Sequence, residues 1–407
     1  MLAFGTALAL GALFCAWLTA GFLCFREDFH VELDRPLARV LVMASLILIA
    51  GGLLLTRAEA PGFAWIGSAL GPFCFELSRF RVALGLITWL ILAFIPLFVR
   101  KPEALALPSL AAAAALTAVL STSVLWQLFW IEVALWAGSW QRRRASKGWH
   151  YFLAVTFALV AGLPLILLGA RAPQFSLSAL LPGMQFLFVG LFVFWLVIRL
   201  TLIWTSDERP VVLATLAIPV LVLAWTLFTR RATPLEVAWV WGLGLGLVSI
   251  VLALDTKGRL DGTGTALLLI GSAALAVPGY CPVGAAACLL LGGALLLGVE
   301  ARWPGSLSRW SAGSVWLLLL LTGPGTAFSW WAIASLSNTA LGHEPAAKLA
   351  AWLAGMILVV VTMVLWQATS IDTQSGRTVP TRTLVCVLFG RSEEHTSELQ
   401  LRQVISY

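Results

Sequence analysis

Charged residues are scarce in this sequence. Only 11% of the 407 residues are Asp, Glu, Lys or Arg, whereas a soluble domain carries about 25%. Apolar residues make up 60% of the chain, which leaves no room for a sizeable soluble domain. The composition therefore predicts an integral membrane protein surrounded by lipid. The net charge of +7 then reflects cations in membrane loops rather than a nucleic-acid partner.

Motifs of soluble enzymes and metal sites are also missing. The six cysteines show no Cys-x-x-Cys spacing and lie in or beside apolar segments, where cysteine behaves as a small hydrophobic residue. The sequence has no phosphate-binding loop, and the glycines at 242–246 fall inside an apolar segment, which indicates close helix packing. We therefore expect no cofactor, no metal and no catalytic residue.

Apolar runs of about 20 residues, the length that crosses a bilayer, recur along the whole chain. They lie at 2–24, 37–56, 81–99, 105–121, 123–140, 150–170, 183–204, 211–229, 234–254, 263–279, 282–300, 313–336 and 347–369, and another begins near 381. The segment 63–75, with Trp65, is expected at the membrane surface. The pattern predicts an all-α, polytopic membrane protein with about 14 transmembrane helices.

The cations between these runs predict the orientation. With the N-terminus outside, the inside loops hold Arg26, Arg35, Arg39, Arg100, Lys101, Arg142, Arg143, Arg144, Lys147, Arg209, Lys257, Arg259, Arg302, Arg309, Arg377 and Arg382. The outside loops hold the smaller set of Arg57, Arg79, Arg81, Arg171, Arg230, Arg231 and Lys348. Because short inside loops are rich in Lys and Arg, we expect a multi-pass protein of the cell inner membrane with its N-terminus outside.

Glu132 is the one carboxylate that the sequence places deep inside an apolar run. A charge at bilayer depth costs at least a few kcal/mol, so such residues usually face a polar pathway or a partner. The alternative is a protonated, hydrogen-bonded Glu with a structural role. Arg199, in the run at 183–204, is the only deep cation, and it lies close enough to the inner end of this run for its side chain to reach the membrane surface.

Five short motifs occur in a fixed order. They are Phe63-Ala64-Trp65-Ile66 leading to Phe75-Glu76-Leu77-Ser78-Arg79-Phe80-Arg81, then Phe129-Trp130-Ile131-Glu132, Trp204 with Asp207, Asp255-Thr256-Lys257-Gly258-Arg259-Leu260, and Gly323-Pro324-Gly325-Thr326. In this order they resemble the motifs of the antiporter-like, proton-conducting subunits of respiratory complex I, a family shared with cation/proton antiporters and membrane-bound hydrogenases. The usual Gly-Val-Asp-Gly before the third helix is absent.

The resemblance implies a domain plan with two inverted five-helix repeats. Residues 1–104 would form helices 1–3, 105–229 the first repeat and 230–369 the second, with Gly323, Pro324 and Gly325 breaking helix 12. Residues 370–390 would begin a truncated fourteenth helix. Residues 391–407 resemble a translated sequencing-library adapter, so we expect a non-native tail there.

The chain departs from the family at the residues that carry protons. If Trp204 and Asp207 are matched to the family motif, the family's lysine falls at Trp195, one helical turn from Arg199. In addition, no Lys or His occurs in 211–229, where the family keeps its central lysine. Arginine stays charged and cannot relay a proton. We therefore predict a degenerate proton path in which Glu132 and Arg199 form a static intramembrane ion pair.

The resemblance implies a membrane subunit of a proton-translocating, NADH–quinone oxidoreductase-like complex for H⁺ or Na⁺. Such a subunit would be partly structural, at most non-catalytic, and partnered by other membrane subunits. An unrelated small-solute transporter is one alternative. A polytopic lipid-linked glycosyltransferase is another, but it needs charged residues in a substantial outside loop, and 171–182 contains no acid.

Overall fold

The computed structural model describes residues 2–26, 34–55, 63–66, 73–75, 78–90, 92, 106–139, 180–203, 209–228, 234–254, 259–278, 281–302, 319 and 324–375. The helices in these residues are α1 (Leu2–Arg26), α2 (Asp34–Leu55), α3 (Arg79–Trp89), α5 (Ala106–Leu120), α6 (Val124–Ser139), α8 (Pro182–Ile203), α9 (Arg209–Phe228), α10 (Leu235–Leu254), α11 (Asp261–Ala274), α12 (Cys281–Arg302), α14 (Pro324–Ala340) and α15 (Glu344–Ser375). Each of them overlaps one of the predicted apolar runs.

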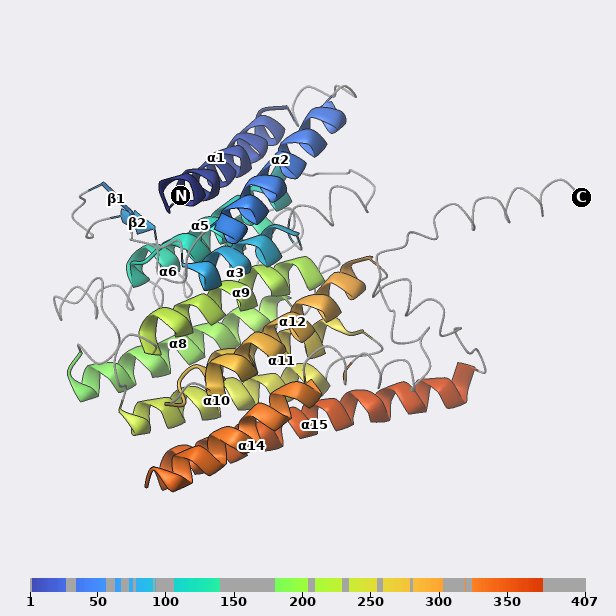
Figure 1. Cartoon of the computed structure of the whole chain (residues 1–407). Helices are drawn as coiled ribbons and strands as arrows, with labels where there is room; N and C mark the ends of the chain where they lie inside the picture. Colours follow the sequence, from blue (N-terminus) through green and yellow to red (C-terminus); the bar gives the residue numbers. More distant parts are fainter. Residues whose placement is uncertain are drawn as a thin grey trace, which may run out of the picture.

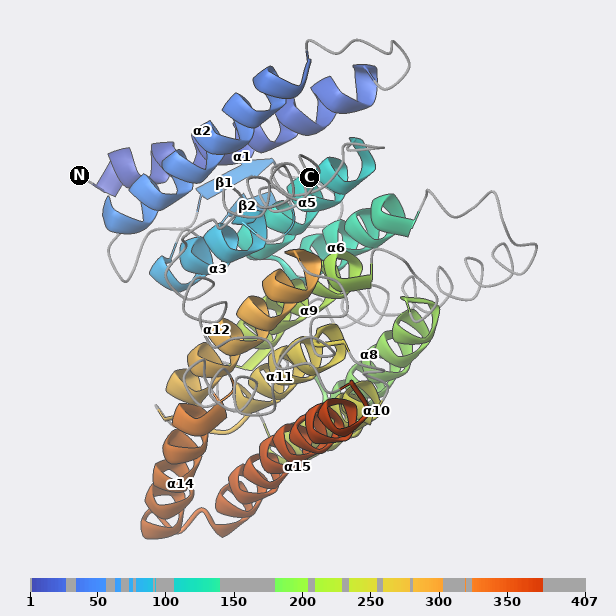
Figure 2. The same cartoon turned by 90° about the vertical axis from the view of Figure 1, so that its right-hand side faces the viewer.

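The helices pack side by side in one elongated bundle (Figure 1). The pair α1 and α2 lies at one end of the bundle and the pair α14 and α15 at the other, and the view turned by 90° shows the same order (Figure 2). The predicted helix at 150–170 and the run that begins near 381 lie outside the described residues.

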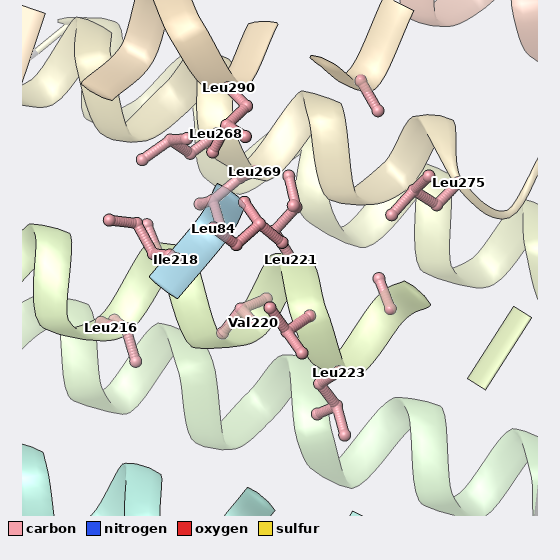
Figure 3. Packing of buried hydrophobic residues seen from close by; sticks show 14 of the residues in the cluster. Leu84, Leu216, Ile218, Val220, Leu221, Leu223, Leu268, Leu269, Leu275 and Leu290 are labelled. Carbon is pink, nitrogen blue, oxygen red and sulfur yellow. The ribbon is translucent and has the colours of Figure 1, made fainter. Parts of the chain in front are cut away.

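Helix α9 is the centre of the bundle. It packs against α3, α5, α6, α8, α11 and α12, and most of its side chains from Leu213 to Phe228 are buried. Figure 3 shows that Leu221 leaves the helix on one side, and Leu216 and Leu223 on another. A helix that is apolar all round is suited to such a buried position, and α9 carries no Lys or His.

Glycines let three neighbouring helices approach α10 and α11 closely. A Cβ at position 246 of α10 would lie 2.2 Å from the Trp352 ring of α15, and one at position 244 would lie 2.9 Å from Val193 of α8. A Cβ at position 264 of α11 would lie 2.8 Å from the backbone oxygen of Gly293 in α12. The prediction that the glycines at 242–246 serve close packing is confirmed.

The described residues also hold one small antiparallel sheet, which the sequence did not predict, in a structure that is otherwise helical as predicted. Strand β1 (Phe63–Ile66) pairs with β2 (Phe73–Phe75), and Phe75 also forms a bridge with Ser121, at the turn between α5 and α6. The segment was expected to be a surface-lying stretch. Its aromatic residues pair as strands, because aromatic side chains favour a pleated surface. Its place at the membrane surface stays a prediction.

Three described helical segments are long and apolar enough to cross a membrane: Leu235–Leu254, Val283–Glu300 and Glu344–Gln367. Shorter apolar segments of 10–17 residues lie within α1, α2, α3, α5, α6, α8 and α9. Helices α14 and α15 are joined at Gly342, whose φ of 78° closes α14 with a left-handed residue. The structure is that of a helical membrane protein.

Candidate functional site

Glu132 lies near the middle of α6, about 12 Å from its first residue at 1.5 Å per residue. The side chain is 9% exposed. Its carboxylate Oε1 accepts a hydrogen bond of 2.7 Å from the indole Nε1 of Trp195. Trp195 belongs to α8 and is itself buried, so the bond joins α6 to α8 inside the bundle.

Arg199 lies on α8, one helical turn beyond Trp195. Its backbone is helical, but its side chain lies outside the described part of the structure. The ion pair between Glu132 and Arg199 therefore stays a prediction. The partner that the structure does give Glu132 is Trp195, the position to which the resemblance assigns the family's lysine.

Beyond Trp195, aromatic rings continue into the bundle. The Phe192 ring lies 5.2 Å from the Trp195 ring, measured between centroids, and stacks at the same distance on Trp241 of α10. Trp241 also meets Phe228 of α9 edge-on at 5.1 Å, and its indole Nε1 donates to the Ser272 carbonyl of α11 at 3.2 Å. An unbroken series of contacts thus leads from Glu132 to α11.

A second polar cluster surrounds Arg81, in the first turn of α3. This side chain is fully buried, whereas the sequence placed it in an outside loop and left Arg199 as the deep cation. Its guanidinium donates to the carbonyl oxygen of Val119 at 3.3 Å, to the carbonyl oxygen of Ser121, and to the hydroxyl of Thr226 at 2.7 Å. These acceptors lie at the C-terminal end of α5 and on α9.

Gln127 of α6 completes the Arg81 cluster. Its amide nitrogen donates to the Ser121 carbonyl at 2.7 Å and to the Thr226 hydroxyl at 2.9 Å. The cation suits this place because the last carbonyls of a helix lack intrahelical partners and carry the negative end of the helix dipole. Arg81 was missed because a cation two residues from a helix start is ordinarily assigned to a loop.

Acidic side chains gather at the N-terminus of α11. Glu300, at the end of α12, is fully buried; it accepts from the Leu260 backbone N–H at 3.0 Å and lies 3.7 Å from the Arg259 Nε. Asp261 is also fully buried, and its Oδ1 accepts from the Gly262 N–H at 2.7 Å. Burial of a carboxylate is therefore not limited to Glu132, the one acid that the sequence places deep inside an apolar run. The others lie at a helix N-terminus, where backbone donors stabilise negative charge.

The remaining predicted site residues concern the break in helix 12. Helix α14 begins at Pro324 and contains Gly325. Proline suits the first helical position, where its missing N–H is not needed. Gly323 lies outside the described residues, as do Trp204, Asp207, Asp255 and Lys257 of the other motifs. The proposed break itself stays a prediction.

Within the part of the chain that the structure describes, no three His, Cys, Asp or Glu side chains are grouped so that they could hold a metal ion. The cluster around Arg81 instead combines one charged group with hydroxyl, amide and backbone partners, and the cluster at α11 combines Glu300 with Arg259 and a backbone N–H. Such an arrangement can orient helices and hold charge. The carboxylate of Glu132 lies in mid-helix and faces Trp195 inside the bundle.

The sequence matches no family model and no curated protein, but its fold is shared with solved structures. A chain of the membrane-bound sulfane sulfur reductase, an archaeal respiratory membrane complex, superposes with a TM-score of 0.65 and 10% identity over 94% of this chain and 92% of that one. A chain of Thermus thermophilus respiratory complex I, solved with bound NADH, gives 0.61 and 17% over 93% and 94%.

A chain of the Mrp complex from Dietzia sp. DQ12-45-1b gives a TM-score of 0.58 and 15% identity. It matches 94% of this chain, which spans about half, 49%, of the Mrp chain's length. All three similar chains come from membrane complexes. This chain therefore shares its fold with chains of these three complexes, in agreement with the fold that the resemblance in the sequence implied.

Proposed function

We propose that this chain is a membrane subunit of a proton-translocating redox complex of the NADH–quinone oxidoreductase type, degenerate in its own proton path and partly structural. Its partners would be the other membrane subunits of that complex. The fold shared with chains of two respiratory complexes and of the Mrp complex supports this assignment. The order of the motifs along the chain supports it independently.

The proposal includes a plan for the whole chain. It has about 14 membrane-spanning helices, with inverted repeats at 105–229 and 230–369 after N-terminal helices at 1–104, and a multi-pass arrangement in the inner membrane with the N-terminus outside. Broken helices in such repeats line an internal water path in transporters. In this chain the start of α14 at Pro324 is the candidate for such a break.

The observation that carries the degenerate path is the hydrogen bond from Trp195 to Glu132. An indole N–H is a donor only and has no lone pair to accept a proton. A lysine amine at the same position could gain and lose a proton, because burial lowers its pKa readily. Because Trp195 occupies the lysine position, the neighbour of Glu132 on α8 is a hydrogen-bond donor that cannot take up a proton and pass it on.

The same bond supports a structural role, since it ties α6 to α8. We propose that Arg199, one turn further along α8, adds a static ion pair to this connection. A buried pair of this kind contributes little net stability but can select one packing arrangement. Loss of the Glu132 charge would then weaken the fit between α6, α8 and the subunits that pack beside them.

The test compares assembly with proton flux. A tagged full-length chain is purified in mild detergent with its bound subunits, which are quantified by mass spectrometry, and the purified complex is reconstituted to measure protons moved per electron. Glu132→Gln should lower the recovery of partner subunits several-fold while the remaining complex keeps its proton-to-electron ratio. Glu236→Gln, at an exposed acid on α10, should change neither quantity.

Normal assembly with lost proton flux in Glu132→Gln would refute the structural version of this proposal. Neither alternative from the sequence gains a supporting observation from the described residues. A small-solute transporter needs further polar groups around a central binding site, but the groups next to Trp195 are the aromatic rings of Phe192 and Trp241.

A further inference from the structure

Four buried aromatic side chains form a continuous layer inside the bundle: Phe192 and Trp195 of α8, Phe228 of α9 and Trp241 of α10. Neighbouring rings in this layer lie 5.1–5.2 Å apart between centroids. We propose that this layer, here called the aromatic partition, is a barrier that keeps water and protons from passing between Glu132 and the polar side chains of α11. The inference deepens the proposed function, on which it rests, by naming what interrupts the path.

Burial and packing leave little room for water in the partition. Phe192 and Trp241 are fully buried, and Trp195 is 1% exposed. A buried water needs two to four polar partners, and the faces of these rings offer none. Apolar constrictions of this kind stop conduction in channels by excluding water.

The polar atoms of the partition are already occupied, and they point to its two sides. The Trp195 indole N–H donates to Glu132, and the Trp241 indole N–H donates to the Ser272 carbonyl. Neither nitrogen can accept a proton. A proton on Glu132 therefore has no acceptor within the rings through which it could reach α11.

Polar groups of α10 and α11 lie on the side of the partition that faces away from Glu132. Helix α11 carries buried Thr263, Thr265 and Ser272, and Ser249 of α10 donates to the Ala266 carbonyl of α11 at 3.2 Å. If the rings were removed, water could bridge Glu132 to these hydroxyl and carbonyl groups. The partition thus lies between Glu132 and the Ser272 carbonyl of α11.

The test measures passive proton leak in liposomes that contain the purified full-length chain alone. A potassium diffusion potential drives protons inward, and a trapped pH dye reports their entry. Wild-type protein should leak no more than protein-free liposomes. Phe192→Ala should raise the leak about tenfold or more, because the cavity opens the layer at its centre.

Two matched controls separate the partition from cavity formation in general. Phe188 lies one turn before Phe192 on α8 and is equally buried, so Phe188→Ala should leave the leak near the wild-type value. The second pair compares tryptophans. Trp241→Ala should leak, whereas Trp89→Ala should not, although Trp89 is also fully buried and also donates to a backbone carbonyl, that of Val42, at 3.3 Å.

Adding Glu132→Gln to Phe192→Ala tests where the path begins, and it should remove most of the added leak. Thermal unfolding of every variant identifies those that fold, and either of the two pairs is sufficient for the test. The inference is overturned if the wild-type protein already lets protons through, or if folded Phe192→Ala or Trp241→Ala shows no more proton leak than wild type. It is also overturned if the control variants leak as much as the partition variants, or if the added leak persists when Glu132→Gln is combined with Phe192→Ala. None of these results measures the recovery of partner subunits. The proposed structural role of Glu132 is therefore tested independently of the partition.

Discussion

Replacing Arg81 by methionine should destabilise the bundle strongly. The change keeps an unbranched side chain of similar length but removes the guanidinium, which is fully buried and binds the end of α5 and Thr226 of α9. Two of its acceptors, the Ser121 carbonyl and the Thr226 hydroxyl, would keep the donor that Gln127 provides. The Val119 carbonyl would lose the bond it receives from Arg81.

The magnitude follows from these contacts. A hydrogen bond from a charged donor contributes about 1.5–3 kcal/mol, and removing one member of a buried charged network costs about 3–5 kcal/mol. Because Gln127 continues to serve two of the three acceptors, we expect the lower end of that range. The free energy of unfolding should fall by about 3 kcal/mol, which is more than a hundredfold in the unfolding equilibrium.

Reversible unfolding in mixed micelles measures this quantity. Arg81→Lys should lower the free energy of unfolding by about half as much, because lysine keeps the charge but lacks the planar guanidinium that reaches several acceptors at once. Arg259→Met is the comparison, since Arg259 is 30% exposed and its contact with Glu300 is 3.7 Å long. It should cost less than about 1 kcal/mol. If Arg81→Met were as mild as Arg259→Met, Arg81 would not hold α3, α5 and α9 together.

Two further changes test the second half of the bundle. Gly264→Ala should lower the free energy of unfolding by about 1–3 kcal/mol, because its Cβ would lie 2.8 Å from the Gly293 backbone oxygen. Gly190→Ala, whose Cβ would have no atom within 4 Å, should leave this free energy unchanged or raise it in the same assay. Equal effects of the two substitutions would refute the close contact at Gly264. Glu300→Gln should lower the free energy of unfolding by about 1–2 kcal/mol, because it removes the negative charge at the N-terminus of α11. This loss should be larger than the loss caused by Arg259→Gln. A smaller loss than in that control would show that Glu300 acts mainly through its ion pair.

The helices were predictable because a bilayer imposes a length and an apolar composition on every spanning segment. All helices in the described ranges overlap predicted runs, and the close packing at Gly242–Gly246 followed from glycines inside such a run. The strands β1 and β2 were not predicted, since four and three residues are too few to show an alternating pattern. Phe75 of β2 also forms a bridge with Ser121, a contact between distant parts of the chain that no local sequence pattern indicates.

The candidate site was predictable only in part. Glu132 is visible in the sequence because no other acid lies so far from the ends of an apolar run. The resemblance placed the family lysine at Trp195, and the contact between Trp195 and Glu132 is consistent with that alignment. Arg81 and Glu300 could not be found in this way, because whether a residue at a helix end is buried depends on which neighbour covers it.

The buried charges at helix ends follow one electrostatic rule. Arg81, a cation, binds carbonyl oxygens at the C-terminal end of α5, where the helix dipole is negative. Glu300, an anion, accepts an N–H at the N-terminal end of α11, where the dipole is positive. Each charge is thus held by the helix it caps, and moving a proton on or off it would break that cap. Glu132 differs, because it lies in mid-helix and is bound by the Trp195 side chain. Glu132 is thus a buried charge of the described residues that a side chain of another helix binds in mid-helix, and that side chain, Trp195, is the first ring of the aromatic partition.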